Sequence, residues 1–118
     1  MANVDFEKDL TSTREIELST TGRTSGRTIS IPVWFVQQGE QMYLLPVNGS
    51  DSHWYKNVLK TQAICLTARG IKLSAQATPI TDPAAVREVI ERFRAKYGAT
   101  DVQAHYIKHD VAVAVAIA

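Results

Sequence analysis

The sequence has little of what would place the chain outside ordinary globular proteins. It contains one cysteine, Cys65, so an intramolecular disulfide is impossible and nothing in the cysteine usage indicates an oxidising compartment. Its apolar runs fall short of the roughly 18 residues that a membrane-spanning helix needs. Residues 1–8 include two acidic residues and no apolar core, which is unlike a signal peptide. We therefore expect a cytoplasmic protein without a membrane segment.

An excess of charge of one sign is also missing. Lysine and arginine together number 13 against 12 acidic residues, which gives a net charge of +1. A general nucleic-acid binder needs a stronger basic excess to displace counterions from phosphates, so nucleic acid is not an expected partner. The 118 residues, 45% of them hydrophobic, predict one domain over 1–118 that can bury a core without a disulfide or a metal.

Alternating apolar and polar residues predict strands in the first half of the chain. After residues 1–13, which have no pattern and suggest an arm or short helix, the alternation indicates a half-buried strand over 14–21. A second strand is expected over 28–37 and a third over 42–47, and these two form a hairpin. Pro32 cannot donate to a ladder, so we expect its nitrogen to point out of the sheet, at an edge or a bulge.

The second half of the chain adds three more predicted strands. Residues 63–68 and 71–80 form a hairpin, and 111–117 is apolar enough for a buried closing strand. The strands outnumber the helices and do not alternate with them, which argues against a parallel doubly wound sheet. The sequence therefore predicts an α+β fold, a six-stranded antiparallel split β-barrel with two or three helices.

The clearest helix is expected over residues 83–97. Asp82 is a good N-cap, and the proline at the first helical position has its backbone torsion already set for a helix. Apolar residues recur on one face of this segment at helical spacing. Gly98 follows as a predicted left-handed C-cap.

Two shorter helices are expected. One runs to about residue 60 and begins at Asp51 or Ser52, since the side-chain oxygen of either can accept hydrogen bonds from the first turn. The other covers 101–108, where His105 and His109 have the i, i+4 spacing that can hold a metal. No carboxylate completes a ligand set nearby, so we interpret this pair as a solvated helix face and predict no metal site.

The segment that carries chemistry is Thr20-Thr21-Gly22-Arg23-Thr24-Ser25-Gly26-Arg27. Its two glycines allow a tight turn whose amides converge on one point, and its hydroxyls and arginines suit a phosphate or carboxylate. It is not a nucleotide P-loop, because no Gly-Lys pair is present and a strand follows rather than a helix. From the residues alone, an anion-binding turn and a hairpin turn with solvated arginines remain about equally open.

The same segment, followed by Pro32 in an apolar strand, resembles the deazaflavin-dependent nitroreductase family. In that family a Thr-Thr-Gly-Arg-Lys-Ser-Gly stretch precedes a strand with a Pro-Leu pair. The Asn48-Gly49 loop and the run His53-Trp54-Tyr55-x-Asn57-x-Leu59 are similar to the family's Trp-Tyr-x-Asn-Leu helix. The resemblance covers roughly residues 15–67. The Arg-Ala-Lys-Tyr-Gly run that ends at Gly98 is similar to a related branch of split-barrel proteins.

The resemblance implies a protein that binds a deazaflavin (coenzyme F-420) or FMN. It implies a flavin- or deazaflavin-dependent oxidoreductase that transfers hydride to an electron acceptor, like a nitroreductase or quinone reductase. The cofactor supplies that chemistry, so no catalytic side chain is required. A homodimer is also implied, because many relatives place the cofactor between subunits. The implied cofactor-binding residues are Arg23, Thr24, Ser25, Gly26, Arg27, Pro32, Asn48, Trp54 and Tyr55.

Three positions depart from the family's pattern, and each of them lacks a positive charge that the family usually has. Thr24, Ile29 and Asn48 stand where the family usually has a lysine or an arginine. Charge-assisted hydrogen bonds contribute about 1.5–3 kcal/mol each, so these changes weaken an anion site unless Arg27 reaches the same phosphate. They motivate a second hypothesis, a non-enzymatic split-barrel protein that binds a small ligand or serves assembly and has lost the cofactor.

Overall fold

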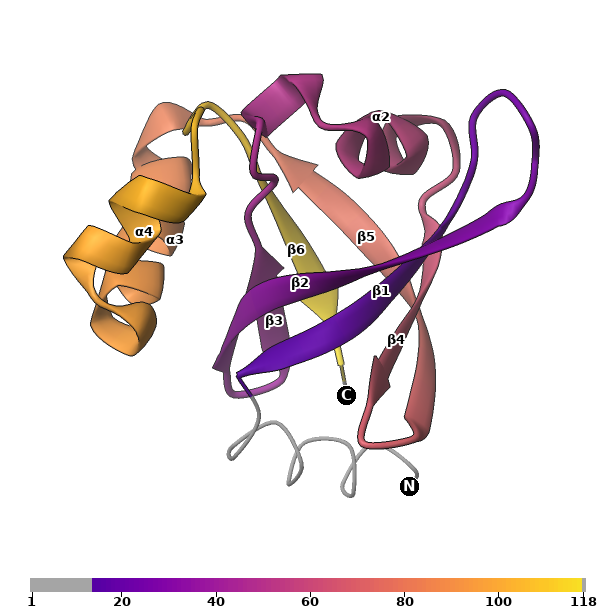
Figure 1. The fold of residues 1–118 in the computed structure, drawn as a ribbon, viewed down its shortest axis with the longest axis horizontal. Coiled ribbons are helices and arrows are strands. Elements are labelled where there is room, and N and C mark those ends of the chain that lie inside the picture. The colour runs from indigo at the N-terminus through magenta and orange to yellow at the C-terminus, as the bar shows by residue number, and fades with distance from the viewer. Residues whose placement is uncertain (1–13, 118) are drawn as a thin grey trace.

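The computed structural model describes residues 14–117, which form a closed six-stranded antiparallel β-barrel flanked by helices (Figure 1). The strands are β1 (Glu15–Thr21), β2 (Thr28–Gln38), β3 (Gln41–Leu44), β4 (Ala63–Ala68), β5 (Ile71–Ile80) and β6 (Ala112–Ala116). Their order around the barrel is β1-β2-β3-β6-β5-β4. The predicted fold class is confirmed. The arm or short helix expected over 1–13 lies outside the described residues.

Helices cover one end and one flank of the barrel. They are the 3-10 helix η1 (Gly49–Asp51), α2 (His53–Lys60), α3 (Pro83–Tyr97) and α4 (Ala99–His105). Figure 1 shows α2 across one end of the barrel, with α3 and α4 side by side on its flank. None of the helices within 14–117 is long and apolar enough to cross a membrane.

The core has two parts, which β2 separates. Inward-facing side chains such as Phe35, Leu18 and Leu66 are fully buried and fill the barrel. The neighbouring residue Val36 points the other way, into a second apolar cluster beneath α3 and α4. The face that α3 contributes to this cluster is the one its helical spacing predicts: Val86, Val89, Ile90, Phe93 and Tyr97.

Strand β2 changes partners along its length, and this creates the setting of the site. Its first part, Thr28–Trp34, pairs with β1, whereas Phe35–Gln38 pairs with β3 on the other side. Over the first part, the second edge of β2 has no strand partner among the described residues. Pro32 lies in this stretch, paired with Glu17 of β1 on one side and with no strand partner from 14–117 on the other, where a missing N–H is tolerated. The prediction that Pro32 sits at a strand edge is confirmed.

Several expected boundaries are wrong. Strand β3 ends at Leu44, short of the predicted 47, because the chain turns at Pro46, whose carbonyl accepts from the Gly49 amide at 3.0 Å. Helix α4 covers Ala99–His105 rather than 101–108. Strand β6 is also one residue shorter at each end than the predicted 111–117.

Two predicted caps differ in detail. Ser52 precedes α2, but its hydroxyl accepts from the Asn48 amide at 2.8 Å rather than from the first turn of the helix. Gly98 has φ +97°, a positive value that favours glycine, but its ψ of 142° lies outside the left-handed helical range. Its amide still donates to the Arg94 carbonyl, and its carbonyl accepts from the Val102 amide at 3.1 Å, so one glycine caps the end of α3 and the start of α4.

Candidate functional site

A cavity of about 310 Å³ lies along the unpaired edge of β2. The edge strand, the segment after β3, helix α2 and the end of α4 enclose it. Apolar side chains of β2 such as Ile31 and Val33 form one wall, and the opposite rim is polar, with Asn48, His53 and Asn57. Among the described residues, none of the side chains that line it is an acid, a lysine or an arginine. The cavity therefore suits a mostly apolar, uncharged group with a polar edge.

The loop between β1 and β2, residues 22–27, closes on itself beside this cavity. The Gly22 amide donates to the Arg27 carbonyl at 2.8 Å, and the Gly26 amide donates to the Gly22 carbonyl at 2.9 Å. The Arg27 amide donates to the Ser25 hydroxyl at 3.2 Å. Several amides expected to converge on an anion are thus used within the loop. Among the described residues, the Thr24 and Ser25 amides have no protein acceptor.

Arg23 fastens this loop to α2. Its amide donates to Asn57 Oδ1 at 3.1 Å, and its Nη1 donates to the same oxygen at 2.9 Å and to the His53 carbonyl at 3.2 Å. Lys60 Nζ donates to the Arg23 carbonyl at 2.7 Å. Asn57 is 2% exposed and also donates to the Thr20 hydroxyl at 3.4 Å. The loop and the helix therefore form one hydrogen-bonded unit at the rim of the cavity.

The Arg23 guanidinium also contacts the His53 ring. Arg23 Nη2 lies 3.2 Å from His53 Nδ1. A guanidinium can only donate, so Nδ1 is the acceptor in this contact. Because His53 lines the cavity, Arg23 orients one ring of its rim.

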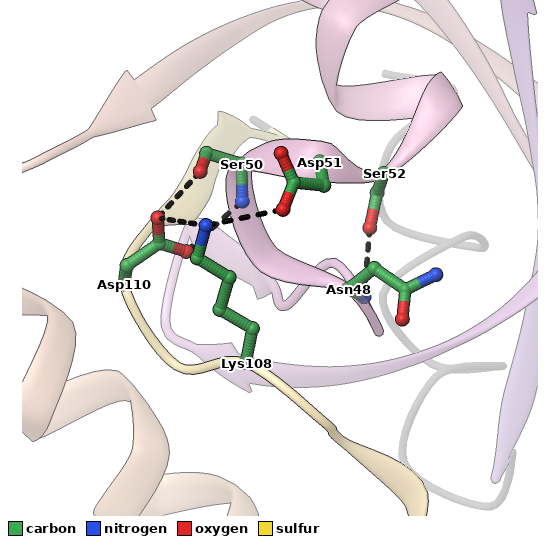
Figure 2. A network of polar contacts seen from close by, with 6 residues as sticks. All are labelled: Asn48, Ser50, Asp51, Ser52, Lys108 and Asp110. Atoms are coloured by element: carbon green, nitrogen blue, oxygen red, sulfur yellow. Dashed lines mark hydrogen bonds and ion pairs between the residues drawn. The ribbon is translucent and has the colours of Figure 1, made fainter.

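Asn48 and Ser52 lie on either side of η1, which a polar network holds in place (Figure 2). Asp110 accepts from both the amide and the hydroxyl of Ser50, at 2.9 and 2.5 Å. Lys108 Nζ lies 3.1 Å from an Asp51 oxygen. Figure 2 shows the Asn48 carboxamide pointing away from these charges. The network therefore fixes the backbone of Asn48 and leaves its carboxamide available at the cavity.

Aromatic rings form the wall next to α4. The indole of Trp34 is stacked on the Tyr97 ring with 4.4 Å between centroids, and on the His105 ring with 4.1 Å. Tyr106 meets Trp34 edge-on at 6.0 Å and closes the end of the cavity. Burial raises the pKa of the Tyr106 hydroxyl well above its usual range, so this group stays neutral.

The structure brings some of the sequence-predicted site residues together and separates others. Pro32, Asn48 and Trp54 line the cavity. Thr24, Ser25, Gly26 and Arg27 lie on the exposed part of the adjacent loop, and Arg23 contacts two residues of the rim. Tyr55 is 3% exposed within the barrel core and does not line the cavity.

Other residues of the site were not among the predicted cofactor-binding residues. Ser52, Asn57 and Tyr106 line the cavity, and so do Trp34 and His105. One signal in the sequence could have identified Asn57. It lies on the apolar face of a short predicted helix, and a buried amide needs hydrogen-bond partners. Trp34, His105 and Tyr106 depend on the return of α4 to β2, which local spacing does not show.

The predicted helical histidine pair does not exist as such. Helix α4 ends at His105, so His109 lies beyond it, and His109 Nε2 is 3.0 Å from the Tyr106 carbonyl. Among the described residues, no cluster of three metal-ligating side chains is present. The i, i+4 arrangement was therefore wrong because the helix stops three residues early.

The closed six-stranded barrel with a ligand-sized cavity at a strand edge defines a protein of the split-barrel class. Within that class the chain belongs to the family described as "Uncharacterized protein conserved in bacteria (DUF2255)", which matches residues 8–116. A comparison with curated proteins finds no match.

Several solved structures resemble the chain at low sequence identity. An F-420-H2 dependent reductase (FDR-A) is 18% identical with a TM-score of 0.66, over 86% of this chain and 93% of that one. A chain described as a domain-swapped dimer is 15% identical with a TM-score of 0.68, over 95% and 98%. The heme storage protein HutZ from Vibrio cholerae is 13% identical with a TM-score of 0.72, over 98% and 89%. At these identities the likeness shows the fold alone.

Proposed function

We propose that this protein is a flavin- or deazaflavin-dependent oxidoreductase that uses coenzyme F-420 or FMN. The observation that carries the proposal is the cavity at the unpaired edge of β2, with an apolar wall, a polar rim and a loop with two arginines beside it. The similar fold of an F-420-H2 dependent reductase supports the choice of cofactor class.

The cavity fits the ring part of such a cofactor. Ring systems of this kind are flat and mostly apolar, with hydrogen-bonding atoms along one edge. The apolar wall of β2, which includes Pro32, would hold the flat faces, and Trp54 would close the far side. The exposed carboxamide of Asn48 offers a donor and an acceptor side by side, which matches an edge that carries an N–H next to a carbonyl.

The loop fits a phosphate, although with fewer cations than the resemblance led us to expect. A guanidinium has five N–H donors, and Arg23 uses three of them on His53 and Asn57. Two therefore remain for an anion, on a side chain that is already oriented. The amides and hydroxyls of Thr24 and Ser25, the exposed Gly26 and the exposed Arg27 complete the proposed phosphate site.

The residues at the cavity indicate which roles belong to the protein and which belong to the cofactor. The bound cofactor would supply the hydride chemistry, for a nitroaromatic or quinone-like acceptor. The residues of this chain would orient the ring, exclude water from its apolar face and hold the phosphate outside the uncharged cavity. We propose no catalytic acid or base from the chain for this step.

We also propose that the protein acts as a homodimer in the cytoplasm. Ile29 at the cavity is 43% exposed and Ile107, near the end of α4, is 79% exposed, so apolar surface is available for a second copy. The likeness to a domain-swapped dimer supports this. Light scattering on purified protein would give twice the 13.0 kDa chain mass, and a monomer at all concentrations would contradict it.

Cofactor binding is tested by thermal unfolding with F-420, FMN and FAD, each at saturating concentration. A ligand at 100 times its dissociation constant stabilises the folded state by about 2.7 kcal/mol, which raises Tm by several degrees. We expect a shift with F-420 or FMN that weakens in the Arg27→Ala variant. The matched control is Arg87→Ala, an exposed arginine on α3 away from the cavity. No shift with any of the three cofactors would contradict the proposal.

A second candidate function is non-enzymatic binding of a small uncharged or planar ligand, or a role in assembly. The part of the lining that the structure describes has no acid, lysine or arginine, which favours it, as does the similar fold of a heme storage protein. The discriminating measurement is oxidation of reduced F-420 or FMN in the presence of a nitroaromatic or quinone. Turnover above the rate of the free cofactor excludes the second candidate, whereas binding without turnover supports it.

A further inference from the structure

The side chain of Trp34 is covered on both faces. Tyr97 lies on one face at 4.4 Å between centroids with an interplanar angle of 10°, and His105 lies on the other at 4.1 Å with an angle of 16°. Trp34 and His105 both line the cavity, whereas Tyr97 belongs to the apolar cluster beneath α3. The face of Trp34 that is directed to the cavity is therefore occupied by a ring of the protein itself.

The two covering rings are held very differently. The Tyr97 hydroxyl accepts from the Phe35 amide at 3.0 Å, and two carbonyl oxygens are within reach of its single proton, that of Arg14 at 2.7 Å and that of Phe35 at 2.9 Å. The His105 ring is exposed, and among the described residues its nitrogens make no hydrogen bond. Stacking on Trp34 and edge contact with Tyr106 are its ring contacts.

The backbone next to His105 is anchored, so only its side chain needs to move. The Tyr106 amide bonds to the Val102 carbonyl at 3.0 Å, and the Ile107 amide bonds to the Val47 carbonyl at 2.8 Å. The Tyr106 side chain is 3% exposed. Rotation of an exposed side chain between staggered positions is a small and fast change. His105 can therefore leave Trp34 without disturbing α4.

We propose that the cavity face of Trp34 is a ring-stacking subsite and that a planar heteroaromatic ligand takes the place of His105 there. A ring larger than imidazole overlaps more of the indole and gains more from stacking. The cavity of about 310 Å³ is at the lower end of the range for ligand sites, and the departure of His105 enlarges it beside Trp34. The identity of the ring as a flavin or deazaflavin rests on the function proposed above, but the subsite itself does not.

His105 then acts as a built-in competitor for the face of Trp34. A ligand that stacks there must replace the imidazole–indole stack, so its apparent affinity is reduced to the fraction of molecules in which Trp34 is uncovered. This factor is the same for every ring that stacks on Trp34. Removal of the imidazole should therefore raise the affinity of all such rings together.

The test uses riboflavin and lumichrome as probes, because both are planar and neither carries the phosphate that the loop would hold. Binding is followed by quenching of tryptophan fluorescence, since both tryptophans of the chain, Trp34 and Trp54, line the cavity. The variants are His105→Ala, which uncovers Trp34, and His105→Phe, which retains a flat covering ring. Gln103→Ala is the control, since this exposed residue of α4 does not line the cavity.

We expect His105→Ala to bind both probes about three- to tenfold more tightly than the unchanged protein, the range of an aromatic pair. His105→Phe should bind no more tightly, and Gln103→Ala should bind equally. Unchanged or weaker binding by a folded His105→Ala, or no binding of either probe by any variant, would overturn the subsite. If the probes behave as expected but F-420 and FMN give no thermal shift and no turnover, the proposed oxidoreductase fails and the ring subsite stands.

Discussion

Asp110 and Ser50 are joined by two hydrogen bonds although they are 60 positions apart in the chain. Their contact ties η1, which follows β3, to the segment that leads into β6. Lys108 adds ion pairs to Asp51 at 3.1 Å and to Asp110 at 3.6 Å (Figure 2). The rim of the cavity at Asn48 is therefore positioned from a distant part of the sequence.

Replacement of Asp110 by Asn should lower stability in a pH-dependent way. Burial alone would raise the pKa of Asp110, but hydrogen bonds from Ser50 and the nearby Lys108 ammonium outweigh it and lower the pKa below its ordinary 3.8. The carboxylate thus stabilises the fold at neutral pH, and this contribution is lost as pH falls through the unfolded and then the folded pKa. In urea unfolding, we expect Asp110→Asn to be less stable by about 1 kcal/mol at pH 7. The difference should shrink below pH 4, and a pH-independent difference would contradict this assignment.

Gly49 is required by both its backbone and its neighbours. It has φ +55°, and a Cβ there would overlap Asp110 Oδ1 and lie 2.9 Å from Lys108 Cγ. Gly39 is the matched control, with φ +60° and no atom within 4 Å of the place that a Cβ would take. We expect Gly39→Ala to cost about 1 kcal/mol for the backbone alone and Gly49→Ala about 2–4 kcal/mol. If both variants lost the same free energy of unfolding in urea, the side chains around Gly49 would have moved to make room for the added methyl group. That result would contradict the prediction.

Asn57 should be the most sensitive polar residue of the site. It is 2% exposed and satisfies both the amide and the guanidinium of Arg23. Asn57→Ala is expected to cost about 2–3 kcal/mol and Arg23→Ala about 1 kcal/mol, with the double variant less destabilised than their sum. Amide hydrogen exchange in the loop 22–27 should rise in both. Additive losses without faster exchange would mean that the pair does not hold the loop on α2.

Lys96 should lose its proton at an unusually low pH for a lysine. Burial, and to a lesser degree the Arg14 guanidinium, lowers the pKa of Lys96 from 10.5 to about 8. The ammonium is disfavoured in the folded state, so stability should rise as pH increases from about 8 towards the unfolded pKa. Competitive acetylation read by mass spectrometry should give a midpoint near pH 8 for Lys96. Arg14→Gln should raise the midpoint and Arg87→Gln should not, and a midpoint near 10.5 would contradict the assignment.

The sequence was sufficient to predict those helices and strands whose ends depend only on nearby residues. Asp82 caps α3 by accepting from the Ala85 amide at 3.0 Å, and the helix covers the predicted Pro83–Tyr97. The hairpin of β4 and β5 also has its predicted bounds, because its turn chemistry and alternation agree. The barrel class followed from the count and order of such elements.

The site was predicted only in part because it is assembled from distant segments. Pro32 and Trp54 could be named from a motif, but Trp34 became a cavity residue only because α4 returns to cover it. Ser52 looked like a helix cap, but its hydroxyl instead accepts from the Asn48 amide in the turn that follows Pro46. Such contacts depend on tertiary packing, which spacing along the sequence does not encode.

The barrel is completed by its last strand in chain order. β6 pairs with β3 on one side and with β5 on the other, so both of those strands present open edges until Ala112–Ala116 joins them. During synthesis on the ribosome, nearly the whole barrel sequence must emerge before the sheet can close. Unpaired edges recruit other strands, so the nascent chain depends on chaperones or rapid completion to avoid association with its own copies.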